Sequence, residues 1–156
     1  MRRKDREVAD FNTMLEIMKR CDCCRLGLFD NGSVYIVPLS FGIHERGGQI
    51  RLYFHCAKEG RKIDLIKSNR CVGFEMDTDH LLVKNKVSCE CTFKYSSIIG
   101  KGNAAMVEDS EEKVFGLQSI MEHYGDTSLR DFSPAALEHV AVIRMNIIDL
   151  TCKQHV

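Results

Sequence analysis

The feature that most constrains the fold is a β-hairpin signal between residues 24 and 41. Two β-prone runs, "CRLGLF" and "VYIVPLSF", flank the turn sequence "DNG". Asn-Gly and Asp-Gly steps favour the turn types whose twist matches a pair of antiparallel strands. Pro38 in the second run has no N–H to donate to a neighbour, so this strand is predicted to lie at an edge or a bulge. The sheet therefore begins with an antiparallel pair.

Further β-prone segments follow, and few helices separate them. "QIRLYFH", "RCVGFEMD", the long run 88–108 and "VAVIRMNIIDL" have the composition of strands, and Gly100 and Gly102 predict a bend or a close approach. A doubly wound parallel sheet would need a helix between most consecutive strands, which this sequence lacks. About six strands in antiparallel runs predict an α+β fold built on a barrel or closed sheet. We expect one domain spanning residues 1–156.

Four helices are predicted around this sheet from apolar spacing and capping residues. The first follows Asp10 as its N-cap, and the second runs from near Glu59 to Asn69. The third is capped by Ser110, and a short fourth begins at 133–134 with a serine and a proline. The segment "GDTSLRDF" before the fourth helix is predicted to be a mobile loop.

Composition limits the partners that we expect. Lys plus Arg and Asp plus Glu both number 22, which gives a formal net charge of zero. A general nucleic-acid binder would need excess positive charge. No apolar run approaches the roughly 20 residues of a membrane helix, and the opening "MRRKDREVADFN" lacks the apolar core of a signal peptide. We therefore expect a cytoplasmic protein without nucleic-acid or membrane partners, whose eight cysteines are mostly thiols.

Two cysteine clusters raise the question of a metal site. They are "CDCC" (Cys21, Cys23, Cys24) and "CEC" (Cys89, Cys91). Thiolates from both could bind zinc in an interaction domain, which we keep as an alternative. Both clusters lie at strand starts, where side-chain alternation sends only some members to one face. Buried free thiols that act as small hydrophobic groups are the better explanation, so we predict no metal ligand.

The stretch "YFHCAKEGRKIDLIKSN" places a basic cluster where a helix begins. Lys58, Arg61 and Lys62 gather there, and only Glu59 opposes them locally. The start of a helix carries partial positive charge and free N–H groups, which bind anions and repel cations. Gly60 would let a ligand approach the backbone closely. The cluster is therefore either a phosphate site or a solvated basic turn.

Three further features could line a ligand. His55 ends the strand just before the basic cluster, and Pro38 leaves neighbouring main-chain groups free to face a flat ligand. Ser96 and Ser97 offer hydroxyl groups that can bind phosphate or carbonyl oxygens. Each feature also has an ordinary structural explanation, namely a surface histidine, an edge strand and surface serines.

Four segments together resemble a known family. They are "CRLGLFDNGSVYIVPLSFG", "LYFHCAKEGRKIDLIKSN", "CTFKYSSIIGKGNAAMVEDSEEK" and "VIRMNIIDLTCK", and they span the chain from about Arg3 to Lys153. The sequence resembles the FMN-binding split-barrel proteins related to pyridoxamine 5′-phosphate oxidase, nearest the nitroimidazole-resistance (Nim) flavoproteins. The resemblance implies a six-stranded antiparallel split β-barrel with flanking helices. It also implies a homodimer that holds FMN at the subunit interface.

The resemblance assigns a role to each candidate site residue. Main-chain groups of Val37, Pro38, Leu39 and Ser40 would line the flavin ring, and His55, Cys56 and Ala57 would lie along the ring and ribityl chain. Lys58, Arg61 and Lys62 would surround the phosphate, and Ser96 and Ser97 would complete that pocket. His55 is the catalytic candidate.

The function implied by the resemblance is that of an FMN-dependent oxidoreductase. It would transfer electrons from a reduced nicotinamide to a small-molecule acceptor, with the flavin supplying the redox chemistry. Two alternatives stay open, because a fold does not fix function. The first is a flavin-binding sensor or carrier without turnover, and the second is a haem or deazaflavin in place of FMN.

Overall fold

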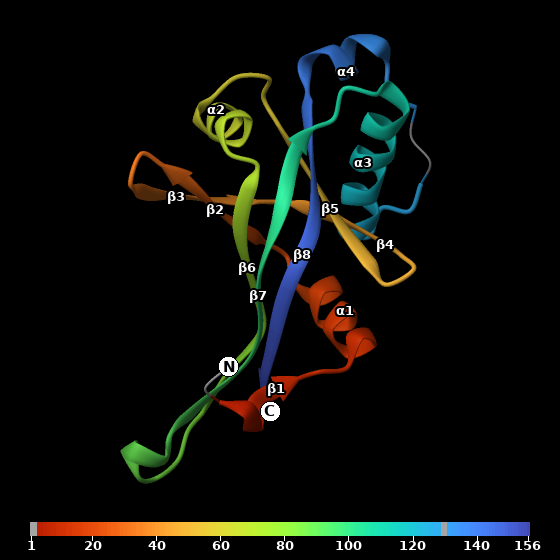
Figure 1. The fold of residues 1–156 in the computed structure, drawn as a ribbon. Coiled ribbons are helices and arrows are strands. Elements are labelled where there is room, and N and C mark those ends of the chain that lie inside the picture. The colour runs from red at the N-terminus through yellow and green to blue at the C-terminus, as the bar shows by residue number, and fades with distance from the viewer. Residues whose placement is uncertain (1–2, 129–130) are drawn as a thin grey trace.

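The computed structural model describes residues 3–128 and 131–156, and an antiparallel sheet dominates it (Figure 1). Its strands are β1 (Glu7–Val8), β2 (Cys24–Asp30), β3 (Ser33–Leu39), β4 (Phe41–Arg46), β5 (Gln49–Cys56), β6 (Cys71–Val83), β7 (Thr92–Met106) and β8 (Ala141–His155). The α-helices are α1 (Phe11–Arg20), α2 (Arg61–Ser68), α3 (Ser110–His123) and α4 (Pro134–His139), with short 3₁₀ turns η1 (Lys4–Arg6) and η2 (Ser88–Glu90).

The strands pair in the order β3-β2-β6-β7-β8-β5-β4, and β1 joins the far end of β8. The edge strands β3 and β4 follow each other in the chain, with only Ser40 between them. The α+β class and the antiparallel pairing are confirmed. The predicted six-stranded closed sheet is wrong, because the sheet has eight strands and is open between β3 and β4. Two features misled the prediction: the single extended run 33–46 serves both edges, and β1 is too short to give a sequence signal.

The predicted hairpin is confirmed in register and turn. β2 and β3 pair from Cys24 with Leu39 to Asp30 with Ser33. Asn31 and Gly32 both have positive φ, at 46° and 91°, as a two-residue hairpin turn requires. Pro38 lies on the edge strand β3, where its missing N–H leaves no neighbour unpaired.

Apolar side chains fill two clusters on opposite sides of the sheet. The larger cluster buries the inward residues of the strands against α1, whose Ile17 and Met18 are fully buried. The smaller cluster lies beneath α3. α3 packs so closely on β4 that a Cβ at Gly42 would lie 2.5 Å from backbone atoms of Ser119 and Ile120. This approach requires glycine.

The close approach predicted at the two glycines of β7 is also confirmed. A Cβ at Gly102 would lie 2.5 Å from the carbonyl oxygen of Asn146, and one at Gly100 would lie 2.5 Å from that of Asp149. Both contacts are with the backbone of β8, and the β7–β8 register shifts between Lys101 and Gly102. The glycines therefore serve strand packing at this irregularity.

The helix caps agree with the sequence at most positions. Asp10 and Ser133 accept backbone N–H bonds at the starts of α1 and α4, and Asn69 ends α2. The predicted cap of α3, Ser110, is wrong. Asp109 caps this helix by accepting from the N–H of Glu112 at 2.8 Å. Part of "GDTSLRDF", namely residues 129–130, lies outside the described residues. No described helix has the length and apolar character needed to cross a membrane.

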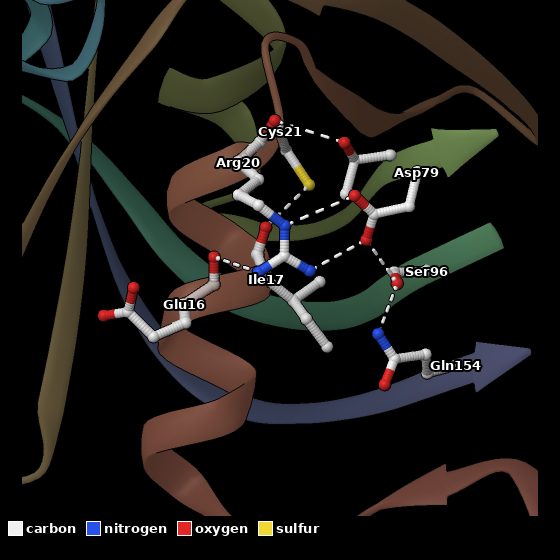
Figure 2. Close-up of polar contacts among 8 residues, drawn as sticks. Glu16, Ile17, Arg20, Cys21, Asp79, Ser96 and Gln154 are labelled. Atoms are coloured by element: carbon white, nitrogen blue, oxygen red, sulfur yellow. Dashed lines mark hydrogen bonds and ion pairs between the residues drawn. The ribbon is translucent and has the colours of Figure 1, made fainter. Parts of the chain in front are cut away.

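A polar network fixes the end of α1 to three strands (Figure 2). Arg20 donates two bonds to Asp79, with its Nη2 at 2.8 Å from Oδ2 and its Nε at 3.3 Å from Oδ1. The Ser96 hydroxyl donates to Asp79 at 2.7 Å and accepts from Nε2 of Gln154 at 3.1 Å. Thr78 Oγ1 donates to the carbonyl oxygen of Arg20 at 3.2 Å. The network thereby joins α1 to β6, β7 and β8.

We predict that Asp79→Asn lowers the free energy of unfolding by about 1 kcal/mol at pH 7, since the pair is partly exposed and water screens it. Bonds from Arg20, and then from Ser96, lower the pKa of the Asp79 carboxyl. A lowered folded-state pKa gives stability that is present above about pH 4 and is lost as the pH falls through the folded-state pKa. The difference between variant and wild type should therefore shrink in acid.

Urea unfolding at several pH values measures this difference. Asparagine suits the positive φ of 60° at position 79, so backbone strain does not confuse the result. Asp131→Asn, at an exposed loop residue, is the control and should change little. A destabilisation by Asp79→Asn that is independent of pH would show that the carboxylate charge does not matter.

Candidate functional site

The candidate site lies where β5 ends and α2 begins. His55 and Cys56 are the last residues of β5 and pair with Val142 and Ala141 of β8. The His55 side chain is exposed, whereas Cys56 packs against the main apolar cluster. Burial raises the pKa of the Cys56 thiol, although the nearby Lys62 charge acts in the opposite direction. The end of β5 therefore offers an accessible imidazole on one face and a half-buried thiol on the other.

The start of α2 lacks the side-chain cap that the other α-helices have. Asp10, Asp109 and Ser133 cap α1, α3 and α4, but Gly60 precedes α2 and supplies no side-chain acceptor. Its carbonyl accepts from Ile63 at 2.9 Å, and among the described residues no acceptor is found for the N–H groups at 61 and 62. Unpaired N–H groups at a helix start bind anions readily.

The backbone at Gly60 leaves room for such an anion. Its φ of 134° is a conformation that residues with a Cβ rarely adopt, and a Cβ there would have nothing within 4 Å. Glycine is therefore required for the chain direction and not for packing. The surface above the α2 start is open.

The basic residues around this helix start have different surroundings. Arg61 donates from Nε to Asp30 at 2.8 Å, makes a second bond to Asp30 through Nη2, and lies over the Tyr35 ring at 4.8 Å. The prediction that only Glu59 opposes the cluster is therefore wrong. Lys58 and Lys62 have no ion-pair partner within the described part of the chain. Two cations consequently remain available to a ligand.

The edge segment 37–40 comes close to the end of β5. Val37 and Leu39 pack against the main apolar cluster, and Pro38 is exposed opposite Arg25. β4 and β5 pair from Phe41 with Phe54, so continuing this register by one residue places the exposed Ser40 beside His55. The structure thus brings segment 37–40, 55–57 and the α2 start to one end of the sheet.

Ser96 and Ser97 lie elsewhere in the chain. Ser96 is 0% exposed, and its hydroxyl already bonds Asp79 and Gln154 (Figure 2). Ser97 points to the opposite face of β7, between Asp77 and Lys153. Arg70, which follows α2, meets β7 at Ala104, and residues 96 to 104 span about 26 Å of strand. Ser96 therefore lies about 26 Å along β7 from this contact with the segment after α2.

A single chain does not enclose a cofactor at these residues. The cavity that includes Lys58 has a volume of about 140 Å³, whereas cofactor pockets usually measure about 300–1,000 Å³. Cavities of about 460 and 420 Å³ lie elsewhere, one between α1, β4 and α3 and one between α1, β5 and β8. The candidate site is therefore an open surface in one chain.

The two cysteine clusters differ in burial. Cys21 and Cys24 are buried as predicted, and burial raises the pKa of the Cys21 thiol to about 12. Cys89 and Cys91 are exposed near the tip of the β6–β7 hairpin, so their predicted burial is wrong. Their spacing suits a strand, but the hairpin extends beyond the body of the protein and leaves them without a core (Figure 1). Among the described residues, no group of three or more His, Cys, Asp or Glu side chains could hold a metal ion.

Sequence reasoning missed Asp30 and Tyr35, which hold Arg61 beside the α2 start. The sequence pattern identifies Asp30 only as part of the "DNG" turn, and Tyr35 only as a β-prone residue. Their proximity to Arg61 arises because α2 packs over the β2–β3 hairpin, and local patterns carry no signal for this contact.

Comparison with solved structures shows fold similarity over nearly the whole chain. A candidate 5-nitroimidazole antibiotic resistance protein from Bacteroides thetaiotaomicron is 30% identical, with 95% of this chain and 86% of that chain covered and a TM-score of 0.82. The flavocytochrome Anf3 from Azotobacter vinelandii is 21% identical, with 100% and 72% covered and a TM-score of 0.80. The FAD and heme binding protein from Mycobacterium smegmatis is 16% identical, with 96% and 73% covered and a TM-score of 0.80. A search of curated proteins finds no match.

The family models give a more specific result. Residues 10–154 match the model described as pyridoxamine 5′-phosphate oxidase, which covers strands β2 to β7, nearly all of β8, all four α-helices and the candidate site. This match and the 30% identity to the Bacteroides protein agree with the motifs at the β5–α2 junction. The chain belongs to the pyridoxamine 5′-phosphate oxidase family.

Proposed function

We propose that this protein is an FMN-dependent oxidoreductase that transfers electrons from a reduced nicotinamide to a small-molecule acceptor. The observation that carries the proposal is the uncapped start of α2, where two free N–H groups meet unpaired lysines beside His55. A phosphate is the anion that suits such a helix start. The similarity to a candidate 5-nitroimidazole resistance protein supports a nitroaromatic compound as the acceptor.

Different residues of the candidate site would bind the cofactor and transfer a proton. The N–H groups of Arg61 and Lys62 and the lysine side chains would hold the phosphate, while Asp30 keeps Arg61 in place. Main-chain groups of 37–40 would line the ring, and 55–57 would lie along it. The flavin would supply the redox chemistry when bound. The exposed His55 imidazole is positioned to hold or transfer a proton at the substrate.

We further propose that the protein acts as a homodimer with FMN at the subunit interface, in the cytoplasm. The open site of one chain supports this, because a second chain could cover it. The outer face of the sheet also exposes apolar side chains on paired strands, including Val34 (68%), Ile36 (63%) and Phe29 (56%). Exposed apolar surface of this kind commonly marks an interface.

Anaerobic mixing tests the proposed activity. The purified protein should carry FMN, and NADH or NADPH should bleach the flavin absorbance, which a nitroimidazole should then restore. Flavin that stays bound but is never reduced by either donor would favour the alternative of a flavin sensor or carrier. Haem or a deazaflavin released on denaturation would replace FMN in the proposal.

We predict that the double substitution Arg61→Ala and Lys62→Ala weakens FMN binding about 10- to 100-fold, since Lys62 would lose a charged hydrogen bond worth about 1.5–3 kcal/mol and Arg61 its positive charge beside the phosphate. The free energy of unfolding should fall by only about 1 kcal/mol, because the Arg61 side chain is 62% exposed, although that of its partner Asp30 is 12% exposed. Equilibrium dialysis and urea unfolding measure the two quantities.

Asp30→Asn is the matched control for that variant. It removes the partner of Arg61 but keeps both cations, so FMN binding should stay within about threefold of wild type. If Asp30→Asn releases FMN as strongly as the double variant, the ion pair matters for structure and the phosphate assignment fails.

We predict that His55→Ala retains FMN but lowers the turnover rate about 100-fold, the lower range for loss of a proton-transfer group. Flavin content is read from absorbance, and turnover from steady-state oxidation of the nicotinamide. His44→Ala on β4, whose ring packs against Phe115, is the control and should leave turnover unchanged. Loss of flavin in His55→Ala would instead make His55 a cofactor-binding residue.

A further inference from the structure

A basic groove runs along α2, next to the proposed phosphate site. It consists of two adjoining cavities of about 140 and 260 Å³, which share Lys67, Met106 and Glu108. The first cavity lies between α2, α3 and the start of β8, and the second follows the end of α2 toward Arg70. The groove begins at the small cavity beside Lys58 described above, and its other lining residues have no role in the candidate site.

The charges that line this groove are mostly positive. They are Lys58, Lys67, Arg70 and Lys113, against the single carboxylate of Glu108. Lys113 donates to the carbonyl oxygen of Leu137 at 2.9 Å, whereas the other three cations are exposed and form no ion pair within the described residues. Lys67 suits the negative end of α2, but the helix dipole explains neither Lys58 nor Arg70. This local excess occurs in a chain of zero net charge.

The floor of the groove is apolar. Ile63, Ile66 and Val107 are buried there, and Met106 is half-buried. Methionine adapts its shape to flat ligands. An apolar floor with cations at the rim suits a ligand that combines phosphate groups with a base and a sugar.

We propose that this groove binds the adenosine diphosphate part of a dinucleotide, an inference that rests on the proposed function. Lys58 belongs both to the groove and to the residues at the α2 start, so a pyrophosphate could extend from one to the other. Lys67 and Arg70 meet its phosphate groups, and the apolar floor receives the adenine. Two sources share this chemistry: the adenylate half of FAD, and the reduced nicotinamide that donates electrons.

Direct binding of ADP to the protein loaded with FMN, which leaves the groove free, tests the groove, with isothermal titration as the measurement. ADP should bind the wild type, and the double substitution Lys67→Gln and Arg70→Gln should weaken it about tenfold or more. FMN binding should stay unchanged in the same variant. The matched control, Lys84→Gln with Lys86→Gln, removes the same charge from the exposed β6–β7 hairpin and should leave ADP affinity unaltered.

The same variants distinguish the two possible ligands, FAD and the reduced nicotinamide. A dinucleotide flavin predicts that the wild type prefers FAD to FMN and that the groove variant loses this preference. A nicotinamide donor predicts a raised KM for NADH or NADPH in the groove variant, with kcat and flavin content unchanged. Absence of ADP binding to the wild type, or equal weakening by the control pair, would overturn the groove assignment. FMN binding by the wild type tests the proposed function separately.

Discussion

The structure depends on one extended segment that supplies both edges of the sheet. Residues 33–39 pair with β2, and residues 41–46 pair with β5, so the chain crosses from one edge to the other at Ser40. Because of this crossing, the edge segment 37–40 reaches the end of β5. His55 and the start of α2 lie at the same end, which makes a composite site from parts distant in sequence. Without the crossing, a flat sheet would separate them by its full width.

The candidate site also depends on the absence of a capping side chain at the start of α2. Each of the other three α-helices has a capping side chain that accepts from one N–H group of its first turn. At α2 a glycine with positive φ replaces the cap, and Arg61 and Lys62 stand in the first turn together with one acidic residue, Asp64. An external anion would satisfy the free N–H groups there. Asp30 offsets part of the charge by holding Arg61, but Lys58 and Lys62 are left for the ligand.

The network around Asp79 gives Ser96, a predicted ligand contact, a structural role within the chain. Ser96 resembles a phosphate contact in sequence, yet its buried hydroxyl has a donor and an acceptor within the chain. A buried polar group without partners would be costly, so packing of β6, β7 and β8 decides the role of this residue. The same network holds α1 against the sheet through Arg20 (Figure 2).

The sequence by itself determined the features that depend on near neighbours. The hairpin with its Asn31–Gly32 turn, the edge position of Pro38, the cap at Asp10 and the antiparallel α+β class were all predictable, because turns, caps and side-chain alternation involve residues a few positions apart. Only the tertiary structure decided that one run serves both edges, that Asp30 pairs with Arg61 and that Ser96 is committed to Asp79. These contacts join residues from 17 to 31 positions apart, across elements whose packing no local pattern specifies. The sequence therefore predicted an anion site at the start of α2, and the fold decided that Arg61 pairs with Asp30 there.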